Sequence, residues 1–181
     1  MMRILFIALV CLMIALFWLK VRISEEQKEL PIFLQHDQIA TDHRTHIDVF
    51  CESVYTPDEF QLALLKQDYS NIWAHLNHLY NTNEVEIGKE YYTENWFSQI
   101  NRHHDGPLPS PLIRKDLHHE LHIKNWASDA LVCTAVDSNV ILQFSNSGLI
   151  RTSKYHVAVV LLFQGDHWRI DALSWLGGTE Q

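Results

Sequence analysis

The sequence predicts an α+β protein, with an N-terminal transmembrane helix and a domain of helices packed on an antiparallel sheet of about four strands. Three patterns lead to this prediction. Residues 4–19 are an uncharged apolar run, residues 56–80 repeat apolar side chains at helical spacing, and the chain after Pro111 alternates as strands do. Helices followed by a series of consecutive strands are typical of α+β domains.

The composition indicates a folded, acidic protein. Of the 181 residues, 47% are hydrophobic and 20% are charged, and the formal net charge is -8, which is typical of a globular chain. All Asp and Glu residues follow Ser24, so the negative charge lies beyond the apolar run. A negative surface repels phosphate backbones, and nucleic acid is therefore not expected as a partner. The chain has no Gly-rich phosphate loop and no CxxC or HExxH motif, so no cofactor is expected.

The run at residues 4–19 predicts a single-pass transmembrane anchor over residues 1–22, through which the protein would bind a membrane. As a helix the run spans about 24 Å at about 1.5 Å per residue, slightly less than the ~30 Å hydrocarbon core of a bilayer. Arg3, Lys20 and Arg22 flank the run and can extend to the two interfaces. A cleaved signal peptide is the alternative, but it needs small residues at its cleavage site, which the exit from the run does not provide.

The side of the membrane on which the domain lies stays open from the sequence. The basic residues Lys20, Arg22 and Lys28 behind the run favour a cytoplasmic domain. An apolar run after such a short N-terminal tail is, in contrast, typical of an export signal. We therefore expect an exported, periplasm-like domain, with the cytoplasmic side as the alternative.

The segment between the anchor and the main domain, residues 23–55, is interpreted as a stalk followed by a short membrane-proximal helix. Pro31 breaks the stalk, and a weak apolar stripe places the helix at residues 37–53. Cys51 in this segment and Cys133 in a later apolar stretch could form one disulfide, so their redox state stays open.

The longest helix is predicted at residues 56–80. Thr56 suits the N-cap, Pro57 suits the first helical position, and Glu59 completes a capping box. Apolar residues then recur at alternating spacings of three and four, which places them on one helical face: Leu62, Leu65, Tyr69, Ile72, Leu76 and Leu79. A shorter helix is expected within residues 89–103, before a Gly- and Pro-rich break.

Four strands are predicted after the break, at residues 116–127, 130–144, 155–163 and 168–176. Polar segments with glycine provide turns at residues 146–148 and 164–167, and Gly165 can adopt a positive φ there. The strand at 155–163 is apolar on both faces, whereas a sheet with one solvated face alternates. The second face is therefore expected to be covered, by the 37–53 segment, by a second copy of the chain or by another protein.

The order of these elements resembles the nuclear transport factor 2-like superfamily, which includes SnoaL-like proteins, ketosteroid isomerases and membrane-anchored accessory domains. The resemblance rests on the long capped helix, the smaller helix and the strands that end in the hairpin "GDHWRI", residues 165–170. It covers residues 56–176. It implies a cone-shaped domain, over residues 56–181, in which the helices pack on a curved antiparallel sheet.

Enzymes of that superfamily use an Asp or His inside the cone as a general base, so the resemblance makes Asp171 the candidate catalytic residue. Arg169 shares its face of the last strand. Tyr92, Trp96 and Trp168 are the candidate walls of a ligand pocket. In the alternative interpretation, Arg169 and Asp171 are a surface pair beside a hairpin turn and have no catalytic role.

A second candidate site is a metal site at His118, Glu120 and His122. Alternation places the three side chains on one face of a strand, about 7 Å apart in turn. Two imidazoles and a carboxylate are suitable ligands for Zn²⁺, although this spacing is wide for one ion. The alternative is a polar, solvent-facing edge strand, which also prevents pairing with other chains.

Taken together, the sequence favours a membrane-anchored, non-enzymatic scaffold or assembly subunit of a membrane or envelope complex. It would bind partners through its sheet, either as a homo-oligomer or with other membrane proteins. The alternative function is a small-molecule-binding domain or a SnoaL-like enzyme that uses Asp171 as its general base.

Overall fold

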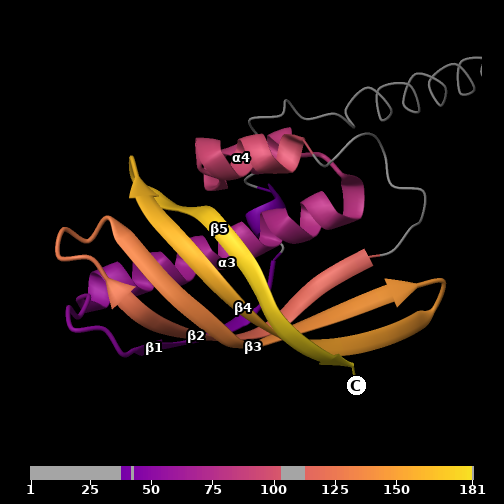
Figure 1. Cartoon of the computed structure of the whole chain (residues 1–181). Coiled ribbons are helices and arrows are strands. Elements are labelled where there is room, and N and C mark those ends of the chain that lie inside the picture. Colours follow the sequence, from indigo (N-terminus) through magenta and orange to yellow (C-terminus); the bar gives the residue numbers. More distant parts are fainter. Residues whose placement is uncertain (1–37, 42, 103–112, 181) are drawn as a thin grey trace, which may run out of the picture. The chain divides into compact units, whose positions relative to one another are not determined.

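The computed structural model describes residues 38–41, 43–102 and 113–180, in which helices pack on one face of a curved sheet (Figure 1). The elements in chain order are β1 (His46–Cys51), α3 (Glu59–Thr82), the 3-10 helix η1 (Glu86–Tyr91), α4 (Glu94–Asn101), β2 (Ile113–Trp126), β3 (Val132–Asn146), β4 (Leu149–Gln164) and β5 (His167–Glu180). Within these residues the sheet is five-stranded and follows chain order from β1 to β5. Strand β1 is parallel to β2, and the other neighbours are antiparallel.

The predicted fold class is wrong in its sheet. The described part of the chain forms a mixed five-stranded sheet rather than an antiparallel sheet of about four strands. The additional strand, β1, lies inside the segment expected to be a helix at residues 37–53. Buried Ile47 alternates there with exposed His46 and Phe50, which is the two-residue period of a strand. The α+β domain therefore includes β1 as well as the residues after 56.

The transmembrane helix of the predicted fold class is not found among the described helices. None of these helices is both long and apolar enough to cross a membrane. The predicted anchor at residues 1–22 and the predicted stalk up to residue 36 lie outside the described residues. Membrane attachment through residues 4–19, and the membrane localisation inferred from it, stay predictions.

Helix α3 confirms the predicted apolar stripe, but its N-cap is Asp58, two residues after the predicted N-cap Thr56. Asp58 is the N-cap, its side chain accepts from the Gln61 backbone N–H, and the Gln61 side chain accepts from the backbone N–H of Asp58. This capping box stabilises a start at Glu59. Five residues of the stripe are buried in the core: Leu65, Tyr69, Ile72, Leu76 and Leu79. The helix ends at Thr82 and is capped by Asn83, whose φ of 65° is left-handed.

Both predicted hairpin turns are confirmed. Strands β3 and β4 are joined at Ser147 and Gly148, with φ of 48° and 90°, and this pair of positive values suits the twist of a tight hairpin. Strands β4 and β5 are joined at Gly165 and Asp166, and Gly165 has a φ of 76°. Glycine adopts these values without the steric cost that a Cβ would add.

Strand β2 contains an irregularity that positions the functional residues. The pairing of β2 with β3 shifts register between Asp116 and His118. As a result, Arg114 and Asp116 are buried before the shift and His119 after it, while Leu117 is 41% exposed. Regular alternation would have placed Leu117 on the same side as His119. The bulge therefore brings three ionisable side chains to the buried face of one strand.

The outer face of the sheet is partly apolar. Half-buried aliphatic side chains alternate there with the core-facing residues of β3 and β4: Val132, Val136, Ala158, Val160 and Leu162. Strand β1 extends the sheet at its edge beside β2, so residues 46–51 do not cover this face as one of the sequence-based alternatives proposed.

Candidate functional site

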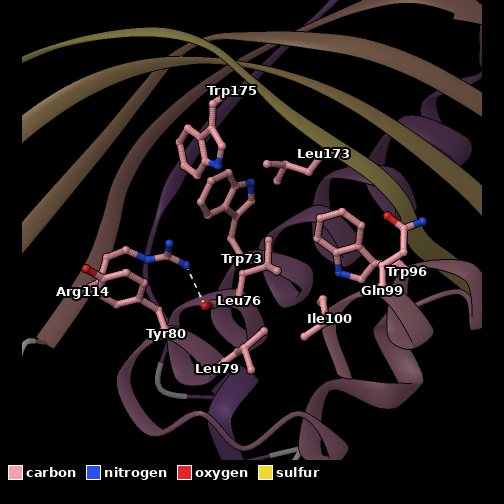
Figure 2. Close-up of a pocket in the computed structure, with 10 residues that line it drawn as sticks. All are labelled: Trp73, Leu76, Leu79, Tyr80, Trp96, Gln99, Ile100, Arg114, Leu173 and Trp175. Carbon is pink, nitrogen blue, oxygen red and sulfur yellow. Dashed lines mark hydrogen bonds between the residues drawn. The ribbon is translucent and has the colours of Figure 1, made fainter. Parts of the chain in front are cut away.

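A pocket of about 310 Å³ lies between the helices and the concave side of the sheet. Its lining residues come from α3, α4, β2 and β5: Trp73, Leu76, Leu79, Tyr80, Trp96, Gln99, Ile100, Arg114, Leu173 and Trp175. Figure 2 shows the indole rings of Trp73 and Trp175 close together on one side and the Trp96 ring on another. Most of the lining is aromatic or aliphatic, which is typical of a small-molecule site.

Arg114 is the charged residue of this lining. The residue is only 8% exposed. Its Nε donates to Asn77 Oδ1 at 2.8 Å, and its Nη2 donates to the Leu76 carbonyl at 2.7 Å. The guanidinium also lies 4.5 Å from the centre of the Tyr80 ring, a favourable cation–π distance. Burial lowers the pKa of Arg114 to about 10, so the group stays protonated at neutral pH.

No described Asp or Glu forms an ion pair with Arg114. Its two hydrogen bonds go to neutral oxygens, and they leave Nη1 without an acceptor among the described residues. A buried cation normally has an anionic partner, because removing the charge from water is costly. Asp116 attracts Arg114 electrostatically, but it is joined to the guanidinium only through Asn77. The pocket wall therefore carries a positive group that no carboxylate of the described chain contacts directly.

One indole N–H group of the lining lacks an acceptor within the described residues. The Nε1 atom of Trp96 is buried and makes no hydrogen bond, whereas the Trp73 side chain interacts with the Tyr69 hydroxyl and lowers its pKa. Both residues line the pocket (Figure 2). A buried donor without a partner costs about 1–3 kcal/mol.

Behind the pocket lies a buried network centred on His119. Its Nδ1 is 2.6 Å from Asp137 Oδ2 and its Nε2 is 2.9 Å from Asp116 Oδ2. Both carboxylates are acceptors, so both imidazole nitrogens donate and the ring is an imidazolium. His119, Asp116 and Asp137 are at most 2% exposed. Tyr69 Oη donates to Asp137 Oδ2 at 2.8 Å, and His43 Nε2 donates to Asp116 Oδ1 at 2.7 Å.

The pKa shifts in this network follow from its hydrogen bonds. Burial by itself would lower the pKa of His119, but its bonds to Asp116 and Asp137 outweigh burial and raise that pKa. Burial by itself would raise the pKa of Asp116, but the bonds from His119 and His43 hold it well below its ordinary range. Burial, and next the charge of Asp137, raises the pKa of Tyr69 well above its usual value. The network therefore favours a protonated His119 beside an ionised Asp116.

The network and the pocket share two residues at their boundary. Asn77 donates its amide N–H to Asp116 Oδ1 and accepts from Arg114 Nε through its amide oxygen. The Trp73 ring lies 4.7 Å from the His119 ring, measured between centroids. The charged network therefore fixes the orientation of Arg114 and Trp73 without itself lining the pocket.

The lining of the pocket suits binding better than acid–base chemistry. Among its residues in the described chain there is no Asp, Glu or His, which are the usual proton acceptors near neutral pH. His119 has both nitrogens engaged with carboxylates and is 0% exposed. What the lining offers instead is an apolar surface with a cation and hydrogen-bond donors.

The structure places Asp171 beside the N-terminus of α4 rather than in the lining of the pocket. Its Oδ1 accepts from Thr93 Oγ1 at 2.7 Å, and Thr93 is the N-cap of α4. Thr93 Oγ1 in turn accepts from the backbone N–H of Trp96. Asp171 therefore positions a helix that contributes Trp96 to the pocket. Arg169 is half-buried on the same strand, and its buried Nε has no acceptor in the described chain.

The three candidate wall residues are separated by the fold. Trp96 lines the pocket. Tyr92 is 2% exposed and its backbone bridges to Ile170 of β5, while burial raises the pKa of its hydroxyl, which has no partner among the described residues. Trp168 belongs to the core near the start of β5, where its backbone N–H donates to Asp68 and its ring packs against Trp126.

The three candidate metal ligands lie on the outer face of β2. His118 Nε2 is 3.4 Å from Glu120 Oε1. His122 instead pairs with Glu52 Oε1 at 2.8 Å, and its ring stacks on Phe50. The structure thus brings His118 and Glu120 together but gives His122 a different partner.

Sequence reasoning missed Arg114, Asp116 and Asp137 as functional candidates. Asp137 interrupts a run of apolar residues in the strand predicted at 130–144, and His119 was placed on the apolar face of its strand. A charged residue at a core position indicates a buried partner, and this pairing was the available signal. Arg114 precedes the predicted strand, so its position gave no comparable signal.

No family model, curated protein or solved structure matches the chain. The resemblance to the nuclear transport factor 2-like superfamily therefore stays a prediction.

Proposed function

We propose that the protein is a binding domain for a small, largely apolar molecule that carries a carboxylate or similar anionic group. The observation that carries this proposal is buried Arg114, which lines an apolar pocket and has no ion pair with any described residue. This corresponds to the small-molecule-binding alternative from the sequence, with Arg114 in place of Asp171 as the central residue.

The chemistry of the pocket defines the ligand class. Aromatic and aliphatic walls stabilise an apolar body, by about 25 cal/mol for each Å² of apolar surface removed from water. The Arg114 guanidinium is a hydrogen-bond donor only, so it selects acceptor oxygens. A guanidinium binds a carboxylate more strongly than a neutral carbonyl, because the hydrogen bond is charge-assisted. A volume of about 310 Å³ suits a molecule of one or two rings.

The test compares 2-naphthoate with 2-naphthamide, which share a ring system and differ in charge. The full chain is purified in mild detergent, because residues 4–19 are apolar, and each probe is titrated by calorimetry. We expect 2-naphthoate to bind more tightly than the amide. A charge-assisted hydrogen bond contributes about 1.5–3 kcal/mol, so Arg114→Gln should weaken naphthoate binding by about 10- to 100-fold.

Two variants separate binding from folding. Arg114→Lys keeps the charge but loses the planar fork, and it should lose less affinity for naphthoate than Arg114→Gln. Lys66→Gln removes an exposed charge from α3 and should bind as the wild type does. The proposal is overturned if the amide binds as tightly as the carboxylate, or if Arg114→Gln weakens both probes equally.

A second candidate function is the scaffold role, for which the partly exposed aliphatic residues of the outer sheet face are the supporting observation. The occupant we propose for this face is a second copy of the chain. Multi-angle light scattering on the full chain should then give a mass of at least two copies, and Val160→Lys should reduce it. A monomeric wild type would remove the support for this role.

A further inference from the structure

The outer face of the sheet carries imidazole and carboxylate groups side by side at the β1–β2 edge. The two strands are parallel, with His46 opposite His118 and Asp48 opposite Glu120. Residues two apart on a strand point to the same face. The four side chains therefore form a square on the face that lies away from α3, and all four are at least partly accessible to solvent.

Three members of this square converge. His46, Asp48 and His118 each offer one ligand atom, and the three atoms lie within 4.8 Å of one another. His46 Nε2 is already 3.2 Å from Asp48 Oδ1. Tetrahedral Zn²⁺ with bonds of about 2.0–2.1 Å holds its ligand atoms about 3.4 Å apart. Small rotations of these exposed side chains close the remaining difference.

The charges at this edge are arranged so that a cation is favoured. Asp48 and Glu120 are like charges directly opposite one another, an arrangement that destabilises a sheet unless it is compensated. The His46 and His118 rings stack with centroids 5.5 Å apart and planes at 12°, so both imidazoles lie beside these acids. A metal ion bound by the imidazoles and Asp48 compensates the negative charge.

The other charged groups on this face do not replace the cation. Lys124 forms an ion pair with Glu52, which also holds His122. Glu120 Oε1 accepts from the Asn139 side-chain amide at 2.7 Å and lies 3.4 Å from His118 Nε2. Glu120 is therefore placed where it can orient the imidazole, as outer-shell carboxylates do at metal sites.

We propose that His46, Asp48 and His118 form a binding site for a divalent transition-metal ion of the Zn²⁺ class. Glu120 fixes the His118 ring, and a fourth coordination position faces solvent. This site draws its ligands from two neighbouring strands, whereas the sequence suggested a site along one strand that included His122. It is separate from the pocket on the concave side of the sheet.

The test measures Zn²⁺ binding to the full chain, purified without a histidine tag and stripped of metal with a chelator. Calorimetric titration with Zn²⁺ at pH 7.5 should show one site. His46→Ala, His118→Ala and Asp48→Asn should each weaken Zn²⁺ binding at least tenfold. His122→Ala removes a histidine of the same strand face and is the matched control, and it should retain the wild-type affinity.

Folding is checked separately, because the substituted side chains are on the surface. Thermal unfolding of each metal-free variant should show a cooperative transition, and added Zn²⁺ should raise the Tm of the wild type and of His122→Ala only. With Co²⁺ as the probe, the wild type should show visible absorption bands that His118→Ala lacks. The proposal is overturned if the wild type binds no Zn²⁺, or if His122→Ala loses as much affinity as His118→Ala.

Discussion

Asp68 provides the sharpest test of how burial controls the charges of this domain. Asp68 lies on α3 and is 4% exposed. Its carboxylate accepts one hydrogen bond from the Trp168 backbone N–H at 2.8 Å. Burial raises the pKa of Asp68 from 3.8 to about 6, even though that hydrogen bond opposes the shift. The ionised form is therefore less stable in the folded protein than in water.

The sign of the effect on stability follows from this shift. Since the folded state holds the Asp68 proton more tightly than the unfolded state does, the stabilising effect is complete below about pH 4 and is lost as pH rises through about 6. At about 1.4 kcal/mol for each pKa unit, the loss amounts to about 3 kcal/mol. Asp68→Asn keeps an oxygen for the Trp168 N–H but does not ionise, so it does not undergo this loss.

The assay is urea unfolding of the full chain, followed by tryptophan fluorescence between pH 4 and pH 8. The stability of Asp68→Asn relative to wild type should rise by about 2.5 kcal/mol between those limits, because about 0.5 kcal/mol is already lost at pH 4. With an m-value of about 2 kcal/mol per molar urea, the difference in midpoint changes by about 1.2 M. His119 and Asp116 titrate in both proteins, so their effects cancel in the comparison.

Glu59→Gln is the control, because Glu59 is an exposed carboxyl at the start of the same helix. Its stability relative to wild type should change little between pH 4 and pH 8. A difference between Asp68→Asn and wild type that stayed constant with pH would refute the reasoning. So would a variant that became less stable than wild type as the pH rose.

Three further predictions follow from buried groups. Tyr69→Phe removes the hydrogen bond to Asp137 and should lower the free energy of unfolding, measured in urea, by about 1.5–3 kcal/mol. Tyr92→Phe is the control, because it removes a buried hydroxyl without a partner in the described chain and should not lower the free energy of unfolding. Equal losses in the two variants would contradict this account. Gly88→Ala should cost about 1–3 kcal/mol in the same assay, since its Cβ would overlap the Tyr92 ring, and unchanged stability would show that the ring can move. Burial raises the pKa of Cys133 to about 12, so iodoacetamide at pH 8 should label it, by peptide mapping, only after unfolding; labelling in the folded protein would contradict its burial.

The helices and hairpins could be predicted from the sequence because their signals are local. The stripe of α3 and the turns at Gly148 and Gly165 depend on spacing and on backbone conformations that nearby residues determine. Strand β1 could not be predicted in this way. Its six residues become a strand because β2, more than sixty residues later, provides a partner and α3 covers Ile47. Tertiary pairing of this kind leaves little trace in a short segment.

The candidate sites also differ in whether local sequence signals or tertiary pairing determine them. Trp96 is predicted as a pocket wall together with Tyr92 and Trp168, from the superfamily resemblance, and of the three only Trp96 lines the pocket. The role of Arg114 depends on the bulge between Asp116 and His118, which changes the face to which the residues before it point. A strict two-residue period cannot anticipate that change. The metal-ligand cluster likewise depends on the register of β1 against β2, which sets His46 beside His118.

A continuous series of hydrogen bonds connects the buried network around His119 to Arg114 in the pocket wall. His119 donates to Asp116, and Asp116, which only accepts, also receives the amide N–H of Asn77. That contact fixes the Asn77 oxygen toward Arg114 Nε, and the Leu76 carbonyl holds Nη2. Because Nε and Nη2 are engaged in these hydrogen bonds, Nη1 is the guanidinium nitrogen that can donate to an anion. An imidazolium between two acids adds little to stability compared with an apolar core, but here it determines the direction of each donor up to the pocket wall.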